Sequence, residues 1–225
     1  MIEEIKRRLN ELATPKIQEF SKKLIPNSLP ILGCKIPDLR KLAKEIGRGD
    51  YWTFLKEYDA SSYELQLVYA YTLASAKLEI KEKISLLRDF VSTIRDWAVC
   101  DGLVSSLKCS KVYPEEMLSF ILEYKESHQE FEVRFLVEML MVYYLTPQYA
   151  SWAVQIVLNL DITYYYAKMG VAWFIATLMI DYPSLGFQLL KEIEDLETVG
   201  MAIRKIRDSY RVSNEIKEEV LFYKK

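Results

Sequence analysis

The chain has 225 residues, 51% of them apolar and 28% charged, so it can bury a substantial core but is short for two large domains. Seven glycines and seven prolines make up about 6% of the chain, roughly half of the ~12% in ordinary proteins, which excludes a glycine-rich phosphate loop and argues against strands joined by tight turns. The net charge of −2 excludes a global basic field, so any nucleic-acid binding must depend on local patches.

Helical periodicity covers nearly the whole chain, and no segment has the alternation of a strand. Thr14 and Pro15 end one helix and begin the next, and Gly47 and Gly49 end the third. A loop with several prolines is expected over 25–36. The helices are predicted over 2–12, 15–24, 37–46, 51–58, 62–76, 80–93, 96–107, 114–125, 129–145, 149–159, 164–181, 184–192, 198–210 and 213–223.

An internal repeat runs through the middle of the chain. Aromatic residues open four of the predicted helices at Tyr63, Trp97, Phe131 and Tyr165, each 34 residues after the one before. A fixed period of this size, with two helices in each unit, is typical of helical-repeat solenoids. The sequence therefore predicts an all-α fold, a curved α-solenoid of HEAT-like repeats in one domain over 1–225, whose second helices line a concave surface.

One position in this repeat is unusual. Asp101 stands where the other repeats have Leu67, Phe135 and Met169, so a carboxylate replaces an apolar side chain. Trp97, four residues earlier, lies on the same helical face. Two interpretations are open: Asp101 has a functional role, or the position is half-exposed or caps a neighbouring helix.

Cysteine and histidine content limits the chemistry. Cys34, Cys100 and Cys109 are odd in number and lack C-x-x-C spacing, which favours buried thiols in a reducing compartment. The single histidine, His128, excludes a site built from several histidines, and we expect it in a solvated loop. The first residues lack an apolar signal core, and the longest apolar stretch, 169–180, is shorter than the ~20 residues that cross a bilayer. A cytoplasmic protein with no membrane segment is expected.

Five segments carry a resemblance to a known family. They are LGCKIPDLRKLAKEI, IRDWAVCD, FEVRF, YYYAKMGVAWFIATLMIDYP and MAIRKIRDSYRVS. Together, over about residues 2–214, the chain resembles the bacterial DNA alkylation repair family, whose best-known members are the AlkD-like HEAT-repeat alkylpurine DNA glycosylases. The resemblance implies a stack of helical repeats that grips duplex DNA in its concave face. It also implies removal of N3- and N7-alkylated purines without swinging the base into a pocket.

The resemblance assigns roles to particular residues. It implies that Asp101 is the active carboxylate beside Trp97, that Trp173 flanks the sugar of the damaged nucleotide, and that Arg134 approaches the DNA backbone. The other interpretation makes both tryptophans core residues and pairs Arg134 with Glu130 or Glu138. Two positions depart from the family pattern: Leu24 replaces a tyrosine, and Ala176 replaces an arginine.

The residue inventory fits this chemistry independently. An alkylated purine is a cationic leaving group, so cleavage of its glycosidic bond needs no general acid and no tuned histidine. A fixed carboxylate such as Asp101 stabilises the oxocarbenium-like sugar and orients the attacking water. The tryptophan faces would contact the electron-poor sugar and exclude solvent. We expect no metal and no organic cofactor.

Basic residues gather in two stretches, which predicts contacts with DNA phosphates. The first holds Lys35, Arg40, Lys41, Lys44 and Arg48, and the second holds Arg204, Lys205, Arg207 and Arg211. The DNA contacts are assigned to Arg134, Lys35, Arg40, Arg204 and Lys205. We therefore expect a monomeric glycosylase that acts on duplex DNA carrying alkylated purines. The alternatives are a HEAT-like-repeat DNA-binding protein that has lost base excision and a protein-binding solenoid.

Overall fold

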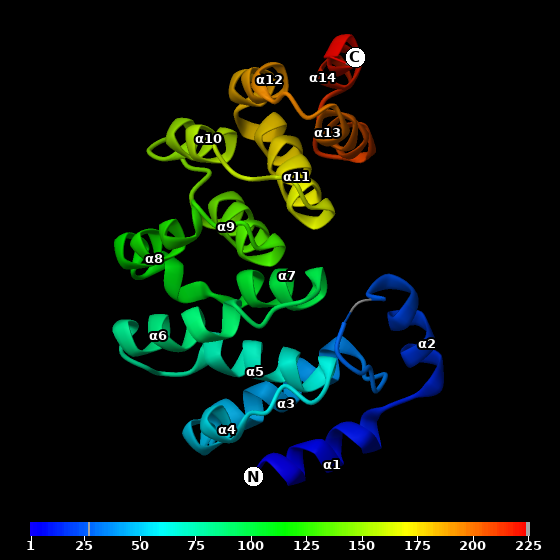
Figure 1. The fold of residues 1–225 in the computed structure, drawn as a ribbon, viewed down its shortest axis with the longest axis vertical. Coiled ribbons are helices and arrows are strands. Elements are labelled where there is room, and N and C mark those ends of the chain that lie inside the picture. Colours follow the sequence, from blue (N-terminus) through cyan, green and yellow to red (C-terminus); the bar gives the residue numbers. More distant parts are fainter. Residues whose placement is uncertain (27, 224–225) are drawn as a thin grey trace. The chain divides into compact units, whose positions relative to one another are not determined.

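The computed structural model describes residues 1–26 and 28–223, and these residues form α-helices and short 3₁₀ turns without any strand (Figure 1). The all-α prediction is confirmed, and the paired helices are those of helical repeats. No helix in the described part of the chain is long and apolar enough to span a membrane. The chain divides into two compact units, Met1–Met117 and Leu118–Lys225.

The helices follow the predicted ones closely. They are α1 (Ile2–Leu12), α2 (Pro15–Leu24), α3 (Ile36–Arg48), α4 (Tyr51–Glu57), α5 (Tyr63–Ser75), α6 (Ile80–Val91), α7 (Trp97–Ser106), α8 (Pro114–Ile121), α9 (Glu130–Tyr143), α10 (Ala150–Leu158), α11 (Tyr165–Asp181), α12 (Pro183–Glu192), α13 (Leu196–Asp208) and α14 (Asn214–Glu219). The 3₁₀ turns are η1 (Lys108–Lys111), η2 (Leu122–Tyr124) and η3 (Val220–Tyr223). Of the two glycines predicted to end the third helix, Gly49 does so, whereas the prediction for Gly47 was wrong because α3 passes through it to Arg48.

Side-chain caps explain several of the helix starts. The carboxylate of Asp50 accepts a hydrogen bond from the backbone N–H of Thr53, and the hydroxyl of Ser62 accepts one from Leu65. Each bond satisfies one of the N–H groups that the first turn of a helix leaves without an internal partner. The side chains of Asp96, Asp195 and Ser213 cap α7, α13 and α14 in the same way.

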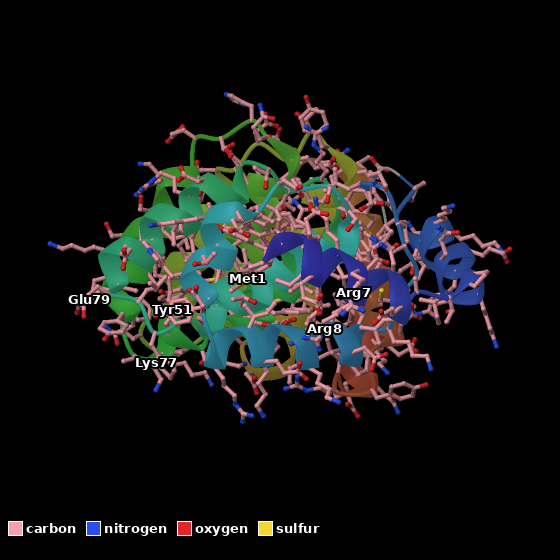
Figure 2. All side chains as sticks on the ribbon, turned by 90° about the horizontal axis from the view of Figure 1, so that it is seen from below. Met1, Arg7, Arg8, Tyr51, Lys77 and Glu79 are labelled. Carbon is pink, nitrogen blue, oxygen red and sulfur yellow. The ribbon has the colours of Figure 1, made fainter. Side chains whose placement is uncertain are left out.

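The first unit is built around α5. This helix packs against α3 on one side and α7 on the other, as Figure 1 shows, and residues 63–74 are all buried. A helix that is buried on every side must be apolar nearly all round. Within this core, Tyr69 of α5 stacks on Phe90 with ring centroids 4.9 Å apart. The hydroxyl of Tyr51, the first residue of α4, donates to the backbone carbonyl of Lys77, which follows the end of α5 (3.1 Å; Figure 2). The helices α3, α5 and α7 therefore form one packed row, and the central helix α5 supplies much of the core of this unit.

The second unit repeats the arrangement with α11 at its centre. This helix packs against α9 and α13, while α10 and α12 contact each other in a second row. Phe120, Tyr124 and Phe135 form an aromatic cluster with ring centroids 5.6 to 6.0 Å apart. Alternating inner and outer helices are the arrangement that the 34-residue period predicts.

The 34-residue register is visible in the contacts between successive repeats. Tyr63, Trp97 and Tyr165 each begin a helix, and Phe131 is the second residue of α9. In three of the four repeats, the third residue after this aromatic side chain donates a hydrogen bond to a group in the next repeat. The bonds are Gln66 Nε2 to the Thr93 carbonyl (3.2 Å), Arg134 Nη1 to the Tyr166 carbonyl (3.0 Å) and Lys168 Nζ to the Asp195 carboxylate (3.0 Å). A polar side chain at this position thus ties one repeat to the next.

The loop between α2 and α3 is held by a buried carboxylate. Glu64 of α5 has no exposed surface, and its oxygens accept hydrogen bonds from the backbone N–H groups of Leu32 (2.9 Å), Gly33 (2.6 Å) and Cys34 (3.2 Å). A buried carboxylate is tolerable when such donors compensate for its lost hydration. The loop is consequently held against α5, and it fixes the position of α2, the helix that precedes it.

A surface pair links two loops of the second unit. His128 is exposed as expected, and its Nδ1 lies 2.7 Å from an oxygen of Asp161. The hydroxyl of Thr163 and the His128 ring hold the pKa of the Asp161 carboxyl at about 2, below its usual range. Because the folded state favours the ionised carboxylate, Asp161 stabilises the fold above the unfolded pKa of about 3.9, and this contribution is lost as the pH falls towards 2.

We expect Asp161→Asn to lower the free energy of unfolding at pH 7 by about 1 kcal/mol or less, because the pair is solvated. The difference from the unaltered protein should shrink as the pH is lowered from 5 to 3, since the Asp161 carboxyl of the unfolded chain takes up its proton in this range while the native carboxylate stays largely ionised. Urea unfolding across this range measures both proteins, with Asp181→Asn at an exposed position as the control. A difference that stays constant with pH would contradict the assignment.

Candidate functional site

Trp97 and Asp101 lie one turn apart on α7, both half-buried. The indole Nε1 of Trp97 donates to the backbone carbonyl of Leu24 at the end of α2 (3.1 Å). This bond restrains the indole of Trp97, which lies one helical turn before Asp101. Leu24 therefore contributes its carbonyl to the position of the Trp97 ring, while its side chain is exposed.

The start of α7 is locked to the loop after α2. Asp96 caps α7 through the N–H of Val99 (2.9 Å) and accepts a second bond from the hydroxyl of Ser28 (2.7 Å). Burial raises the pKa of Asp96, and these bonds oppose the rise. No role was predicted for Asp96, although an aspartate directly before a helical run is a recognised capping signal.

The Asp101 position is not equally buried in all the repeats. Leu67 and Phe135 are fully buried, whereas Asp101 and Met169 are half-buried. The interpretation of a half-exposed position is thus correct for two of the four repeats. Partial exposure lets an ionised carboxylate stay hydrated, and it also leaves that carboxylate accessible to a large ligand.

Arg134 lies on α9, and its guanidinium is buried. Its Nη2 lies 2.6 Å from a carboxylate oxygen of Glu138, and its Nη1 donates to the carbonyl of Tyr166. Buried arginines are normally paired in this way, because an unpaired buried charge is very costly. The geometry favours the interpretation that pairs Arg134 with Glu138 on its own helix.

Trp173 lies on α11 in a hollow of about 360 Å³ and is 40% exposed, so it is not a core residue. The ammonium of Lys205 lies 5.7 Å from the centre of its ring, within the range of cation–π attraction. Arg211 and Ala176 line the same hollow. Lys205 and Arg211 thus share the hollow with the exposed tryptophan, together with the carboxylate of Asp208.

The remaining predicted DNA contacts are exposed cations. Lys35 precedes α3, and Arg204 lies on α13 in a hollow with basic and acidic side chains. Arg40 stacks on the ring of Tyr71, with the guanidinium carbon 4.2 Å from the ring centre. These positions leave the three charges accessible to a polyanion.

The predicted residues are divided between the two units. Lys35, Arg40, Trp97 and Asp101 belong to the first unit, and Arg134, Trp173, Arg204 and Lys205 belong to the second. Within the first unit the structure brings Trp97 and Asp101 together on one turn, and within the second it brings Trp173 and Lys205 together. Each unit therefore presents an aromatic ring beside a charged group.

The structure leaves all three cysteines as free thiols. Cys34 and Cys100 are buried as expected, and Cys109 is half-buried. Burial, with a smaller contribution from the nearby Glu64 carboxylate, raises the pKa of the Cys34 thiol to about 12. A thiol with so high a pKa is neutral at physiological pH and is a poor nucleophile.

Comparison with known proteins agrees with the resemblance seen in the sequence. The family model described as DNA alkylation repair enzyme matches residues 5–207 of the 225. A search of curated protein sequences found no significant match. The family model covers both compact units and every residue discussed in this section except Arg211. The chain belongs to the DNA alkylation repair enzyme family.

Proposed function

We propose that this protein is a DNA glycosylase that excises cationic N3- and N7-alkylpurines from duplex DNA by hydrolysing the N-glycosidic bond. Family membership supports DNA alkylation repair as the role and DNA as the partner. One observation carries the finer proposal: Asp101 is a half-buried acidic residue one turn from Trp97, whose indole N–H is held by the Leu24 carbonyl. Such a fixed pair is suited to a developing positive charge.

The reaction is a substitution at the sugar carbon C1′. The bond from C1′ to the base nitrogen breaks, and its electron pair leaves with the purine, which neutralises the positive charge of the alkylated base. The sugar becomes oxocarbenium-like, and the Asp101 carboxylate stabilises that cation electrostatically. Water then adds to C1′ and loses a proton, which Asp101 is placed to accept. No step in this sequence requires a general acid.

The aromatic and basic residues have separate roles in this proposal. Trp97, one turn from Asp101, offers a ring face to the electron-poor sugar and excludes water, and Trp173 is a further exposed ring for contact with the DNA. Lys35, Arg40, Arg204 and Lys205 contact phosphates, which position the duplex without reading its sequence. Arg134, which forms an ion pair with Glu138 and bonds to the Tyr166 carbonyl, acts by holding α9 to α11 within the second unit.

The test is base release from a duplex that carries a single N7-methylguanine. We expect the purified protein to release the methylated base and leave an abasic site, and to act far less on an undamaged duplex, since a neutral purine is a poor leaving group. Chromatography of the freed base measures the rate. Salt-dependent DNA binding without release would instead identify a non-catalytic DNA-binding protein, and absence of DNA binding at low salt would favour a protein-binding solenoid.

A further inference from the structure

A hollow of about 610 Å³ lies between α13, α14 and η3 in the second unit. Its apolar part comes from Gly200 and Ile203 of α13 and from Leu221 of η3, and the rest of the lining is charged or polar. The helix α11 packs on α13, yet none of its described residues lines the hollow (Figure 1). The hollow therefore lies on a face of α13 that the helices of this unit leave open.

The 34-residue register shows which face of an inner helix receives the next inner helix. In the first unit, a Cβ built on Gly102 of α7 would lie 3.1 Å from the side chains of Leu67 and Tyr71 on α5. These two residues therefore belong to the face of α5 on which α7 packs. Four 34-residue periods later, the same positions on α13 are Ile203 and Arg207, and both line the hollow. The hollow thus occupies the place where a further inner helix would pack on α13.

Gly200 keeps this face of α13 open. Apart from its chain neighbours and the adjoining backbone of α13, nothing that the structure describes lies within 4 Å of a Cβ built on Gly200. A glycine inside a helix lowers helix stability relative to alanine. For Gly102 the close approach of α5 accounts for this cost, but Gly200 has no such neighbour. Leu196, one turn before Gly200 on the same face, is 55% exposed. The face is therefore shaped for close approach of an apolar element from outside the unit.

The charge on this face sets the chemistry of its partner. Arg207 stands where α5 has the buried ring of Tyr71, and Lys217 of α14 lines the same hollow. Neither cation forms an ion pair with any residue that the structure describes. The lining keeps a net positive charge when its other charged residues are counted, which are Arg204, Asp208 and Glu218. Acidic side chains on an incoming helix would complement this charge.

We propose that this surface, defined by Leu196, Gly200, Ile203, Arg207 and Lys217, binds an amphipathic α-helix of a partner protein whose apolar stripe is flanked by acidic residues. The apolar stripe of the partner packs on Leu196 and on the gap at Gly200, much as α7 packs on α5, and its carboxylates pair with Arg207 and Lys217. A nucleic-acid duplex would offer phosphates alone and leave the apolar part of the surface unused. The inference goes beyond base excision and does not depend on it.

The first test measures binding of a synthetic helical peptide of about 20 residues, in which a stripe of leucine and alanine is flanked by glutamates. The control peptide has lysines in place of the glutamates. Fluorescence anisotropy with the whole chain should give a Kd of roughly 10–100 µM for the glutamate peptide, about 10-fold tighter than for the lysine peptide at low salt. Equal affinities, or no saturable binding of the glutamate peptide, would overturn the inference.

Two pairs of variants locate the binding on this surface. Gly200→Leu places a side chain in the hollow while improving helix propensity, so it should weaken binding about 10-fold without unfolding the protein. Ser151→Leu, at an exposed helical position of the same unit, should not weaken it. Arg207→Glu with Lys217→Glu should make the lysine peptide the tighter ligand, whereas Lys125→Glu with Lys191→Glu should keep the original preference. A preference that the first charge reversal leaves unaltered would contradict the proposal.

Two other occupants of the surface are separated by further measurements. Sedimentation velocity over a range of protein concentrations detects a second copy: self-association that Gly200→Leu abolishes would assign the surface to it and overturn the partner helix. Binding to an undamaged DNA duplex detects nucleic acid. If Arg207→Glu with Lys217→Glu abolishes DNA binding and the glutamate peptide does not bind the unaltered protein, the surface is a DNA contact and the proposal is wrong.

Discussion

Asp101→Asn is expected to lower the rate of N7-methylguanine release by about 10²- to 10³-fold, the usual cost of removing one group that stabilises transition-state charge. Asparagine has the same shape but no negative charge, so it leaves the oxocarbenium-like sugar without its electrostatic partner and the water without a proton acceptor. Because the substitution keeps the size and shape of the side chain, it should leave the fold intact. Single-turnover base release with saturating enzyme measures the chemical step.

Two control measurements distinguish a catalytic role of Asp101 from a general effect of charge or a loss of DNA binding. Asp89→Asn removes one exposed negative charge in the same unit, and it should release base at the wild-type rate. Binding of Asp101→Asn to the methylated duplex should be as tight as wild type or tighter, because a negative charge facing a polyanion has been removed. Full release by Asp101→Asn would refute the catalytic role, and a loss of binding together with release would assign the residue to DNA docking.

Gly33→Ala is expected to destabilise the first unit by about 3 kcal/mol or more, which corresponds to a fall in Tm of roughly 6 to 12 °C. Gly33 has a φ of +106°, a conformation that side chains with a Cβ rarely adopt. An added Cβ would lie 2.7 Å from the backbone nitrogen of Gln18 and even closer to the carbonyl oxygen of Thr14. Backbone atoms cannot move aside cheaply, so α2 would have to shift.

The same substitution should reach the candidate site through α2. This helix buries no residue of its own, and its start is held by the bond from the Thr14 N–H to the Gly33 carbonyl (2.9 Å). Its last residue, Leu24, holds the Trp97 indole, so a displaced α2 releases that ring. Gly33→Ala should consequently slow base release at temperatures where the protein is still folded.

Gly47→Ala is the matched control for Gly33→Ala. Gly47 lies inside α3, where an added Cβ would meet nothing nearer than the Ser75 hydroxyl at 3.5 Å. Replacing a helical glycine by alanine stabilises a helix by roughly 0.5–1 kcal/mol. Thermal unfolding followed by circular dichroism should show Tm moving in opposite directions for the two variants. A Gly33→Ala protein as stable as wild type would contradict the close approach of α2.

The sequence predicted most helix boundaries because local physics sets them. Apolar residues at helical spacing and the caps at Asp50, Ser62 and Asp96 depend on neighbours within one or two turns. Gly47 was misjudged for the converse reason, since α3 gains enough from packing on α5 to continue through a residue of low helix propensity.

Part of the candidate site was also predictable. The 34-residue register identified Asp101, because a carboxylate at a position that is apolar in the other repeats is visible in the sequence alone. Helical spacing then placed Trp97 on the same helical face. The role of Arg134 could not be predicted in this way. Its position in the register is polar in several repeats, because the side chain there hydrogen-bonds to the next repeat. The register identifies such a residue, but it does not identify its partner.

The sequence by itself therefore determined the all-helical fold, the 34-residue repeat, and the pair Trp97 and Asp101. Tertiary structure decided which groups hold that pair, namely the Leu24 carbonyl, and which cations share a surface, as Lys217 of α14 does with Arg207 of α13. The physical reason is range. Periodicity and capping act over a few residues, whereas backbone carbonyls and the clustering of distant charges are set only when the helices pack against one another.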